Sequence, residues 1–134
     1  MQPEEWIGQT LARTYLIEAV LGAGGMGAVF RARHLRTHGL VAVKLLKPDV
    51  ATETDLLRRF HDEARVIAAL RHPHIVQVHD FHDADGSPDI PVPFLVMDLL
   101  EGEDLHSRLR RCKRLSYAEA RKLAQEVGSA LQAT

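Results

Sequence analysis

The sequence predicts an α+β fold in which a five-stranded antiparallel sheet carries one helix and is followed by further helices. Short runs within 15–46 are rich in β-branched residues or alternate apolar with polar positions, which is typical of strands. Apolar residues then recur every three or four positions over 52–70, which is typical of an amphipathic helix. Four glycines within 21–30 separate two of the strands, so these strands form a hairpin.

The first three strands follow a lead-in over 1–14. In the second strand, Val29 and Arg31 fall on one face and Phe30 on the other, which is the two-residue period of a strand. Pro48 ends the third strand. These strands are expected at 15–21, 28–33 and 40–46.

The helix that follows has one apolar face and recognisable ends. Thr54 is suited to cap its start, and Pro73 stops it because the residue before a proline avoids the helical region. The apolar face comprises Leu56, Phe60, Ala64, Ile67 and Leu70.

Two strands and two helices complete the predicted chain. Ser116 and Glu119 form a capping-box pattern that opens the last helix. The apolar face of that helix still needs a partner where the sequence ends at Thr134, so we expect an incomplete architecture and self-association through the exposed last helix. The strands are expected at 75–82 and 93–98, and the shorter helix at 105–111.

The composition excludes several classes of protein. The chain is 46% hydrophobic and 26% charged, so it can build a core and is not a disordered tail. Its net charge of -1 argues against a nucleic-acid-binding protein, and the basic residues between 108 and 114 are interpreted as the solvated end of a helix. No apolar run is long enough to span a membrane, and the single cysteine suits a reducing compartment. We therefore expect a soluble, cytoplasmic chain.

The glycine run is the first feature that carries chemistry. Gly22, Gly24 and Gly27 fit the spacing G-x-G-x-x-G, which occurs both in dinucleotide-binding turns and in hairpins that cover ATP. A dinucleotide fingerprint needs the third glycine to open a helix, whereas Gly27 here opens a strand. A Walker loop is also excluded, because no Lys-Ser or Lys-Thr pair follows. The hairpin therefore predicts a cradle for the phosphates of ATP.

A lysine and a glutamate are placed to complete this cradle. Lys44 lies on the next strand, within reach of phosphates held under the hairpin. Glu63 lies in the middle of the helix beside Phe60 and Ala64, near the buried face, where an unpaired carboxylate is costly. An ion pair between Lys44 and Glu63 is therefore expected.

Taken together, these residues resemble the protein-kinase family, and specifically the bacterial serine/threonine kinases. The resemblance covers nearly the whole chain, and the order and spacing of its elements are more specific than the glycine run alone. The matching segments are LGAGGMGAV at 21–29, VAVK at 41–44, RFHDEA at 59–64, LRHPHIV at 70–76 and FLVMDLLEG at 94–102.

The resemblance implies a role for each matching position. Leu21, Val29 and Ala42 would enclose the adenine of ATP, with Met97 behind it, although packing alone would also explain these apolar residues. The carbonyl of Asp98 and the amide of Leu100 would pair with the adenine edge, and Asp104 would contact the ribose. Gly22, Gly24, Gly25, Gly27 and Lys44 would hold the phosphates. The implied division is a small lobe over 15–98, a hinge over 99–104 and the start of a large lobe over 105–134.

The catalytic half of a kinase is missing from these 134 residues. Neither an H-R-D-x-x-x-x-N nor a D-F-G segment occurs, so the carboxylates that would orient the substrate hydroxyl and hold Mg²⁺ are absent. We expect the amino-terminal half of a kinase, inactive alone, that with its large lobe uses ATP and Mg²⁺ to phosphorylate protein Ser/Thr hydroxyls. The alternative is a stand-alone, non-catalytic nucleotide-binding or interaction module that acts on a partner kinase lobe.

The histidines are the remaining candidates for a metal site. His72 and His74 flank Pro73, and His79 and His82 lie on the following strand. Imidazoles on alternating strand faces do not converge, and zinc sites usually group their ligands more tightly. No metal site is therefore expected in this chain.

Overall fold

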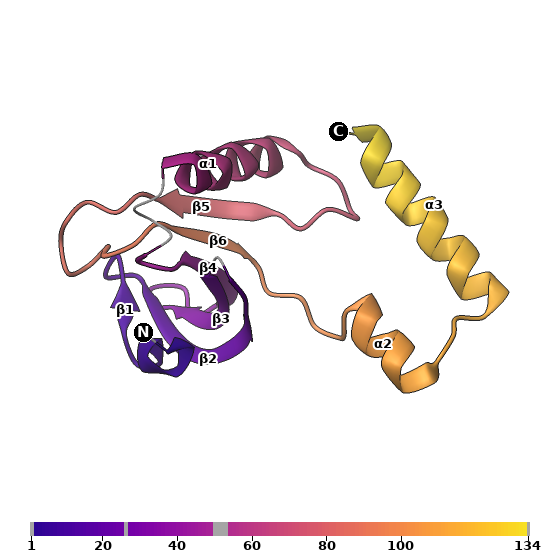
Figure 1. The fold of residues 1–134 in the computed structure, drawn as a ribbon, viewed down its shortest axis with the longest axis horizontal. Helices are drawn as coiled ribbons and strands as arrows, with labels where there is room; N and C mark the ends of the chain where they lie inside the picture. Colours follow the sequence, from indigo (N-terminus) through magenta and orange to yellow (C-terminus); the bar gives the residue numbers. More distant parts are fainter. Residues whose placement is uncertain (1, 26, 50–53, 134) are drawn as a thin grey trace.

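The structure is a computed structural model that describes residues 2–25, 27–49 and 54–133. It combines one curled sheet with three α-helices (Figure 1). The elements in chain order are the 3₁₀ helix η1 (Pro3–Trp6), β1 (Thr10–Leu11), β2 (Tyr15–Ala23), β3 (Gly27–His34), β4 (Leu40–Leu46), α1 (Thr54–Ala69), β5 (Val78–His82), β6 (Phe94–Asp98), α2 (Leu105–Cys112) and α3 (Tyr117–Ala133).

The sheet is antiparallel, as predicted, but it has six strands in the order β1-β2-β3-β4-β6-β5 instead of five. The additional strand is β1, which lies in the predicted lead-in and pairs Thr10 with Leu16 and Leu11 with Tyr15. Two residues are too short to show a two-residue period, so the sequence pattern gave no signal for this strand.

The two faces of the sheet pack in two separate clusters. Since successive side chains of a strand point to opposite faces, Val43 and Leu45 of β4 enter one cluster and Leu46 enters the other. The first cluster includes Phe30, Phe94 and other residues from the lead-in and from five of the strands. The second cluster lies under α1 and comprises the buried residues Leu46, Phe60, Ala64, Val78 and Leu95.

Helix α1 follows the predicted pattern in the part that the structure describes. It buries Phe60 and Ala64, with Leu57 and Ile67 partly buried beside them. The helix ends at Ala69, before Pro73, as expected, whereas positions 52 and 53 of the predicted helix lie outside the described residues.

Strand β5 is shorter than predicted, because it begins at Val78 and the chain is still turning at Ile75. The amide of Ile75 donates to the carbonyl of His72 at 3.1 Å, and ladder pairing begins only at Val78. A register shift between Val78 and Asp80 then changes which side chains face each cluster.

That shift brings Asp80 to the first cluster, where its carboxylate connects β5 to β2. The hydroxyl of Tyr15 on β2 donates to the Asp80 carboxylate at 3.0 Å, and Nε2 of His82 lies 2.7 Å from the same oxygen. The His82 ring also stacks on Phe94, with a centroid distance of 4.7 Å. The sheet is therefore closed by side chains where no strand pairing joins β2 to β5.

Helices α2 and α3 lie apart from the sheet in Figure 1. The predicted capping box of α3 is confirmed: Oγ of Ser116 accepts from the amide of Glu119 at 3.1 Å, and the Glu119 carboxylate accepts from the amide of Ser116 at 3.3 Å. Neither helix buries a residue fully. In the described ranges, no helix combines the length and the apolar character that a membrane span requires.

Candidate functional site

The glycine run connects strand to strand. Strand β2 ends at Ala23, strand β3 begins at Gly27, and the amide of Gly24 donates to the carbonyl of Gly27 at 2.9 Å. The third glycine is the first residue of a strand, as predicted, so the geometry excludes a dinucleotide-binding turn, in which this glycine would open a helix. Met26, between Gly25 and Gly27 in the sequence, lies outside the described residues.

The glycines serve two different physical purposes. A Cβ atom added to Gly22, Gly24 or Gly25 would find no other atom within 4 Å, so these residues border open space. A Cβ on Gly27 would lie 1.9 Å from the carbonyl oxygen of Leu45, a distance that real structures essentially never show. Gly27 is thus required for the close approach of β3 to β4, whereas the other three leave backbone exposed towards the hollow beneath the hairpin.

This hollow has a volume of about 330 Å³ and contains the predicted lysine. Lys44 of β4 pairs in register with Val29 of β3, so the two side chains share a face of the sheet. The other lining residues are Gly22, Ala23, Gly24, Gly25, Gly27 and Ala28. Glycine backbone without side chains, next to one ammonium group, fits the phosphate groups of a nucleotide.

The apolar residues predicted around adenine continue the same face. Ala42 of β4 pairs with Met97 of β6, and Ala42 lies two positions from Lys44 on its strand. Ala42 is buried and Met97 is half-buried, whereas Leu21 and Leu100 are 52% and 73% exposed. The structure therefore brings Ala42, Met97 and Val29 beside Lys44 and leaves Leu21 and Leu100 at the margins.

The expected ion pair between Lys44 and Glu63 is not formed in this structure. Glu63 is exposed on α1. The face of α1 that meets the sheet is occupied by Phe60 and Ala64, and Glu63 lies about 100° around the helix from Ala64. Because water reaches the Glu63 carboxylate, the expected cost of leaving it unpaired does not arise.

Asp98 and Asp104 each have a local partner. The Asp98 carboxylate lies 2.5 Å from Nε2 of His79 on the neighbouring strand. Asp104 caps α2 by accepting a hydrogen bond from the amide of Ser107 at 2.7 Å. The backbone and side-chain hydrogen bonds from Ser107 lower the pKa of the Asp104 carboxyl. The Asp104 residue is exposed.

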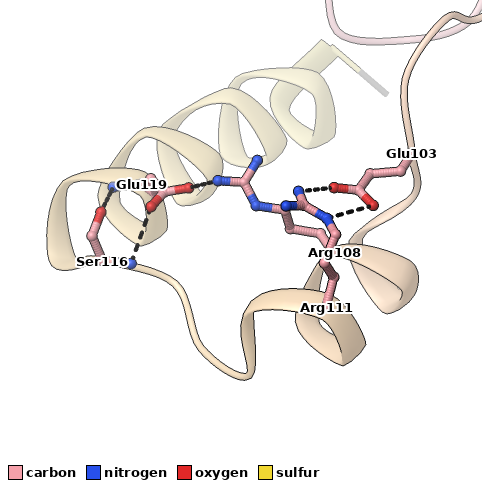
Figure 2. A network of polar contacts seen from close by, with 5 residues as sticks. All are labelled: Glu103, Arg108, Arg111, Ser116 and Glu119. Carbon is pink, nitrogen blue, oxygen red and sulfur yellow. Dashed lines mark hydrogen bonds and ion pairs between the residues drawn. The ribbon is translucent and has the colours of Figure 1, made fainter.

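A network of charged residues fixes α2 against the segment before it and against α3 (Figure 2). Arg111 pairs with Glu103 at 2.5 Å, and this hydrogen bond lowers the pKa of the Glu103 carboxyl. Arg108 reaches across to Glu119 of α3. The basic residues interpreted as a solvated helix end therefore include two that hold neighbouring segments together.

Sequence reasoning missed two features near the site. One is the closure of the sheet by Tyr15, Asp80 and His82, which only tertiary structure brings together. The other is Trp6, which is 7% exposed within the first cluster although it was assigned to a lead-in. The presence of a large apolar tryptophan in a short polar segment was the sequence signal that could have predicted this burial. Over the described ranges, no three His, Cys, Asp or Glu side chains gather as metal ligands.

The comparison with models of protein families identifies the family of this chain. A model of the protein kinase domain matches residues 15–134. The chain belongs to the protein kinase family. Its curled sheet with α1 is the small-lobe fold of a kinase, as the sequence resemblance predicted.

Individual bacterial kinases show the same relation. The kinase chain is 38% identical over 126 residues to the serine/threonine-protein kinase PknA of Mycobacterium tuberculosis, covering 94% of this chain and 29% of the relative. It is 35% identical over 128 residues to the serine/threonine-protein kinase pkn3 of Myxococcus xanthus, covering 96% and 23%. The chain thus spans less than a third of the curated relatives that it matches.

Solved structures support the assignment of the fold. The PknI kinase domain of M. tuberculosis superposes with a TM-score of 0.75 at 32% sequence identity. That match covers 92% of this chain and 48% of the solved chain. The chain therefore corresponds to the amino-terminal part of a serine/threonine kinase domain.

Proposed function

We propose that this chain binds ATP in the hollow beneath the glycine hairpin, as the nucleotide-binding part of a serine/threonine protein kinase. The observation that carries the proposal is the position of Lys44 in that hollow, next to glycine backbone that no side chain covers. Glycine amides and an ammonium group complement the negative charge of a triphosphate. Gly22, Gly24, Gly25 and Gly27 provide that backbone.

The proposed adenine site lies next to the phosphates on the same face of the sheet. Val29, Ala42 and Met97 supply an apolar surface for a flat ring, and Leu21 covers it from the edge. The carbonyl of Asp98 and the amide of Leu100 pair with the adenine edge in this proposal, and Asp104 reaches the ribose. We further propose that Glu63 orients Lys44 after a displacement of α1 towards β4, because in this structure the two side chains are separate.

The proposed reaction belongs to the complete kinase. We propose a small lobe over 15–98, a hinge over 99–104 and the beginning of a large lobe over 105–134. ATP supplies the γ-phosphate, which a complete kinase transfers to a Ser or Thr hydroxyl of a protein. The carboxylates that would hold Mg²⁺ and orient the hydroxyl do not occur in these 134 residues. Lys44 and its neighbours therefore contribute the binding and orientation of the phosphates, in a kinase that we place in the cytoplasm.

The exposed surface of α3 provides the proposed contact with other protein. No residue of α3 is fully buried, and Tyr117 and Val127 are 82% and 48% exposed. Apolar surface of this kind favours association with a further kinase lobe, or with a second copy of the chain when no such lobe is present.

The proposal is tested by measuring ATP affinity after removal of the lysine. Lys44→Ala should weaken the binding of a fluorescent ATP analogue by about tenfold or more, since a charge-assisted contact is worth roughly 1.5–3 kcal/mol. The matched control is Asp85→Ala, because Asp85 is exposed in a loop and bonds only locally to Ser87. Equal losses in the two variants would overturn the site assignment.

A further inference from the structure

Residues 2–14 precede the segment that the family model matches, yet they are built into the sheet. The amide of Gly8 donates to the carbonyl of Ile17, and the amide of Ile17 donates to the carbonyl of Gln9, both at 2.9 Å. The amide of Ala12 donates at 2.8 Å to the carbonyl of Asp89, in the loop before β6. The segment is therefore tied both to β2 and to the opposite side of the first cluster.

Trp6 is the side chain that this segment inserts into the protein. It belongs to the first cluster with Ala28, Phe30 and Leu45, and it is 7% exposed. The space left between Trp6 and its neighbours is about 20 Å³, which is room for roughly one water molecule. The indole therefore fills a closely packed position.

Trp6 lies directly behind the candidate nucleotide site. Ala28 of β3 and Leu45 of β4 pair in register, and they share the face of the sheet that carries Trp6. One residue away along each strand, Val29 and Lys44 pair on the opposite face, which is the face of the hollow. The indole thus packs behind the two backbones that carry the phosphate-binding groups.

Strands β3 and β4 leave no free space between them at Gly27. The Cα of Gly27 approaches β4 so closely that even one methyl group would meet the carbonyl of Leu45 at 1.9 Å. A shift of Leu45 would therefore move Gly27, the first residue after the hairpin, and Lys44, the next residue of β4. Interiors at native packing density transmit such shifts because they cannot deform freely.

We propose that Trp6 is a positioning residue for the phosphates of ATP, holding the glycine hairpin and Lys44 in register from the opposite face of the sheet. The inference rests on the proposed ATP site and adds a residue that touches neither the nucleotide nor the hollow. Its specific consequence is that Trp6 affects the binding of phosphates more than the binding of the adenine ring. The ring contacts lie further along the sheet, at Ala42 and Met97.

The test compares ATP with adenosine, which lacks the phosphates. In the full chain, Trp6→Leu should weaken ATP binding by about tenfold in calorimetric titrations, since small displacements of positioning groups have effects of this size or larger. Adenosine affinity should change by less than about twofold, because its contacts are distant from the indole. Trp6→Phe should restore most of the ATP affinity, and Leu35→Ala, which removes an exposed apolar side chain, should leave both affinities unchanged.

Equal weakening of ATP and adenosine by Trp6→Leu would overturn the inference, because a loss of general stability affects both ligands alike. Unchanged ATP affinity in folded Trp6→Leu would also overturn it while leaving the proposed ATP site intact. If the wild-type chain bound adenosine but showed no preference for ATP, the proposed phosphate site itself would fail.

A second measurement needs no substitution at all. Trp6 is the single tryptophan of the 134 residues, so its fluorescence reports directly on this position. Saturating ATP should shift the emission of Trp6 or change its quenching by acrylamide, and saturating adenosine should not. An emission that ATP leaves unchanged would contradict a mechanical link between the indole and the phosphate site.

Discussion

Gly27 and Gly24 stand three residues apart but are expected to respond differently to the same substitution. Gly27→Ala places a methyl group 1.9 Å from the carbonyl oxygen of Leu45, so β3 and β4 must separate. The free energy of unfolding should fall by about 1–3 kcal/mol, the usual cost of overpacking, or by more if the backbone cannot move. Urea unfolding followed by circular dichroism measures this change.

Gly24→Ala is the matched control at the residue scale. A Cβ at Gly24 meets no atom within 4 Å, so the stability of this variant should stay within about 0.5 kcal/mol of the wild type. A loss of similar size in both variants would show that the hairpin as a whole, and not the contact with Leu45, restricts these positions.

The sequence predicted the position of a residue well where the local pattern determines it. Lys44 was expected on the strand that follows the glycine hairpin, and it lies on β4, where it pairs in register with Val29. The Lys44–Glu63 pair depended on the rotation and distance of a helix relative to a sheet, which no local pattern fixes. Trp6 was missed because burial of a single residue in a short segment is decided by tertiary packing alone.

At the scale of elements, α3 gains little stability from the rest of the fold. Its contacts with the loop after α1 are polar, between His72 and Ser129 at 2.9 Å and between His74 and Glu126 at 3.9 Å. None of its residues is fully buried. Polar contacts on an exposed helix oppose local unfolding only weakly.

We therefore expect 116–134 to be the least protected segment in amide hydrogen exchange of the monomeric chain. The capping box at Ser116 stabilises the first turn by about 1 kcal/mol, but it cannot replace burial of an apolar face. Exchange followed by mass spectrometry compares α3 with β4, whose Val43 is fully buried. Strong protection of α3 in a monomer would contradict this expectation.

The boundaries of the helices and strands show which features of the fold a local sequence pattern can predict. The predicted range 40–46 coincides with β4, and α3 begins directly after its predicted cap, because apolar periodicity and capping residues mark these ends locally. The first strand β1 and the turn before β5 were not recognised. Strand β1 has only two residues, too few to show a two-residue period, and the start of β5 is set by its ladder with β6, which lies further along the chain.

At the scale of the whole molecule, the contact between Tyr15 and Asp80 makes the free energy of unfolding decrease at alkaline pH. Burial, together with the Asp80 carboxylate that accepts the hydrogen bond, raises the pKa of Tyr15 to about 12. An unfolded chain loses this proton near pH 10, so it binds fewer protons than the folded chain between pH 10 and 12. The stabilisation is therefore complete below pH 10 and is lost as the pH rises towards 12.

Tyr15→Phe should remove this dependence. The difference in unfolding free energy between wild type and Tyr15→Phe should shrink by about 1 kcal/mol between pH 9 and 11, as measured by urea unfolding. Tyr117→Phe is the control for the removal of a tyrosine hydroxyl, because Tyr117 is 82% exposed. A constant difference for Tyr15→Phe would show that the Tyr15 hydroxyl does not titrate abnormally.

The order of the six strands also affects how readily the sheets of separate copies of the chain can pair edge to edge. The outermost strands are β1 and β5, and outer strands are where separate chains pair and form aggregates. Here β1 has only two residues, and β5 carries a register shift together with His79, Asp80 and His82. Short or irregular, charged edges are poor templates for a further strand, so this fold resists edge-to-edge aggregation.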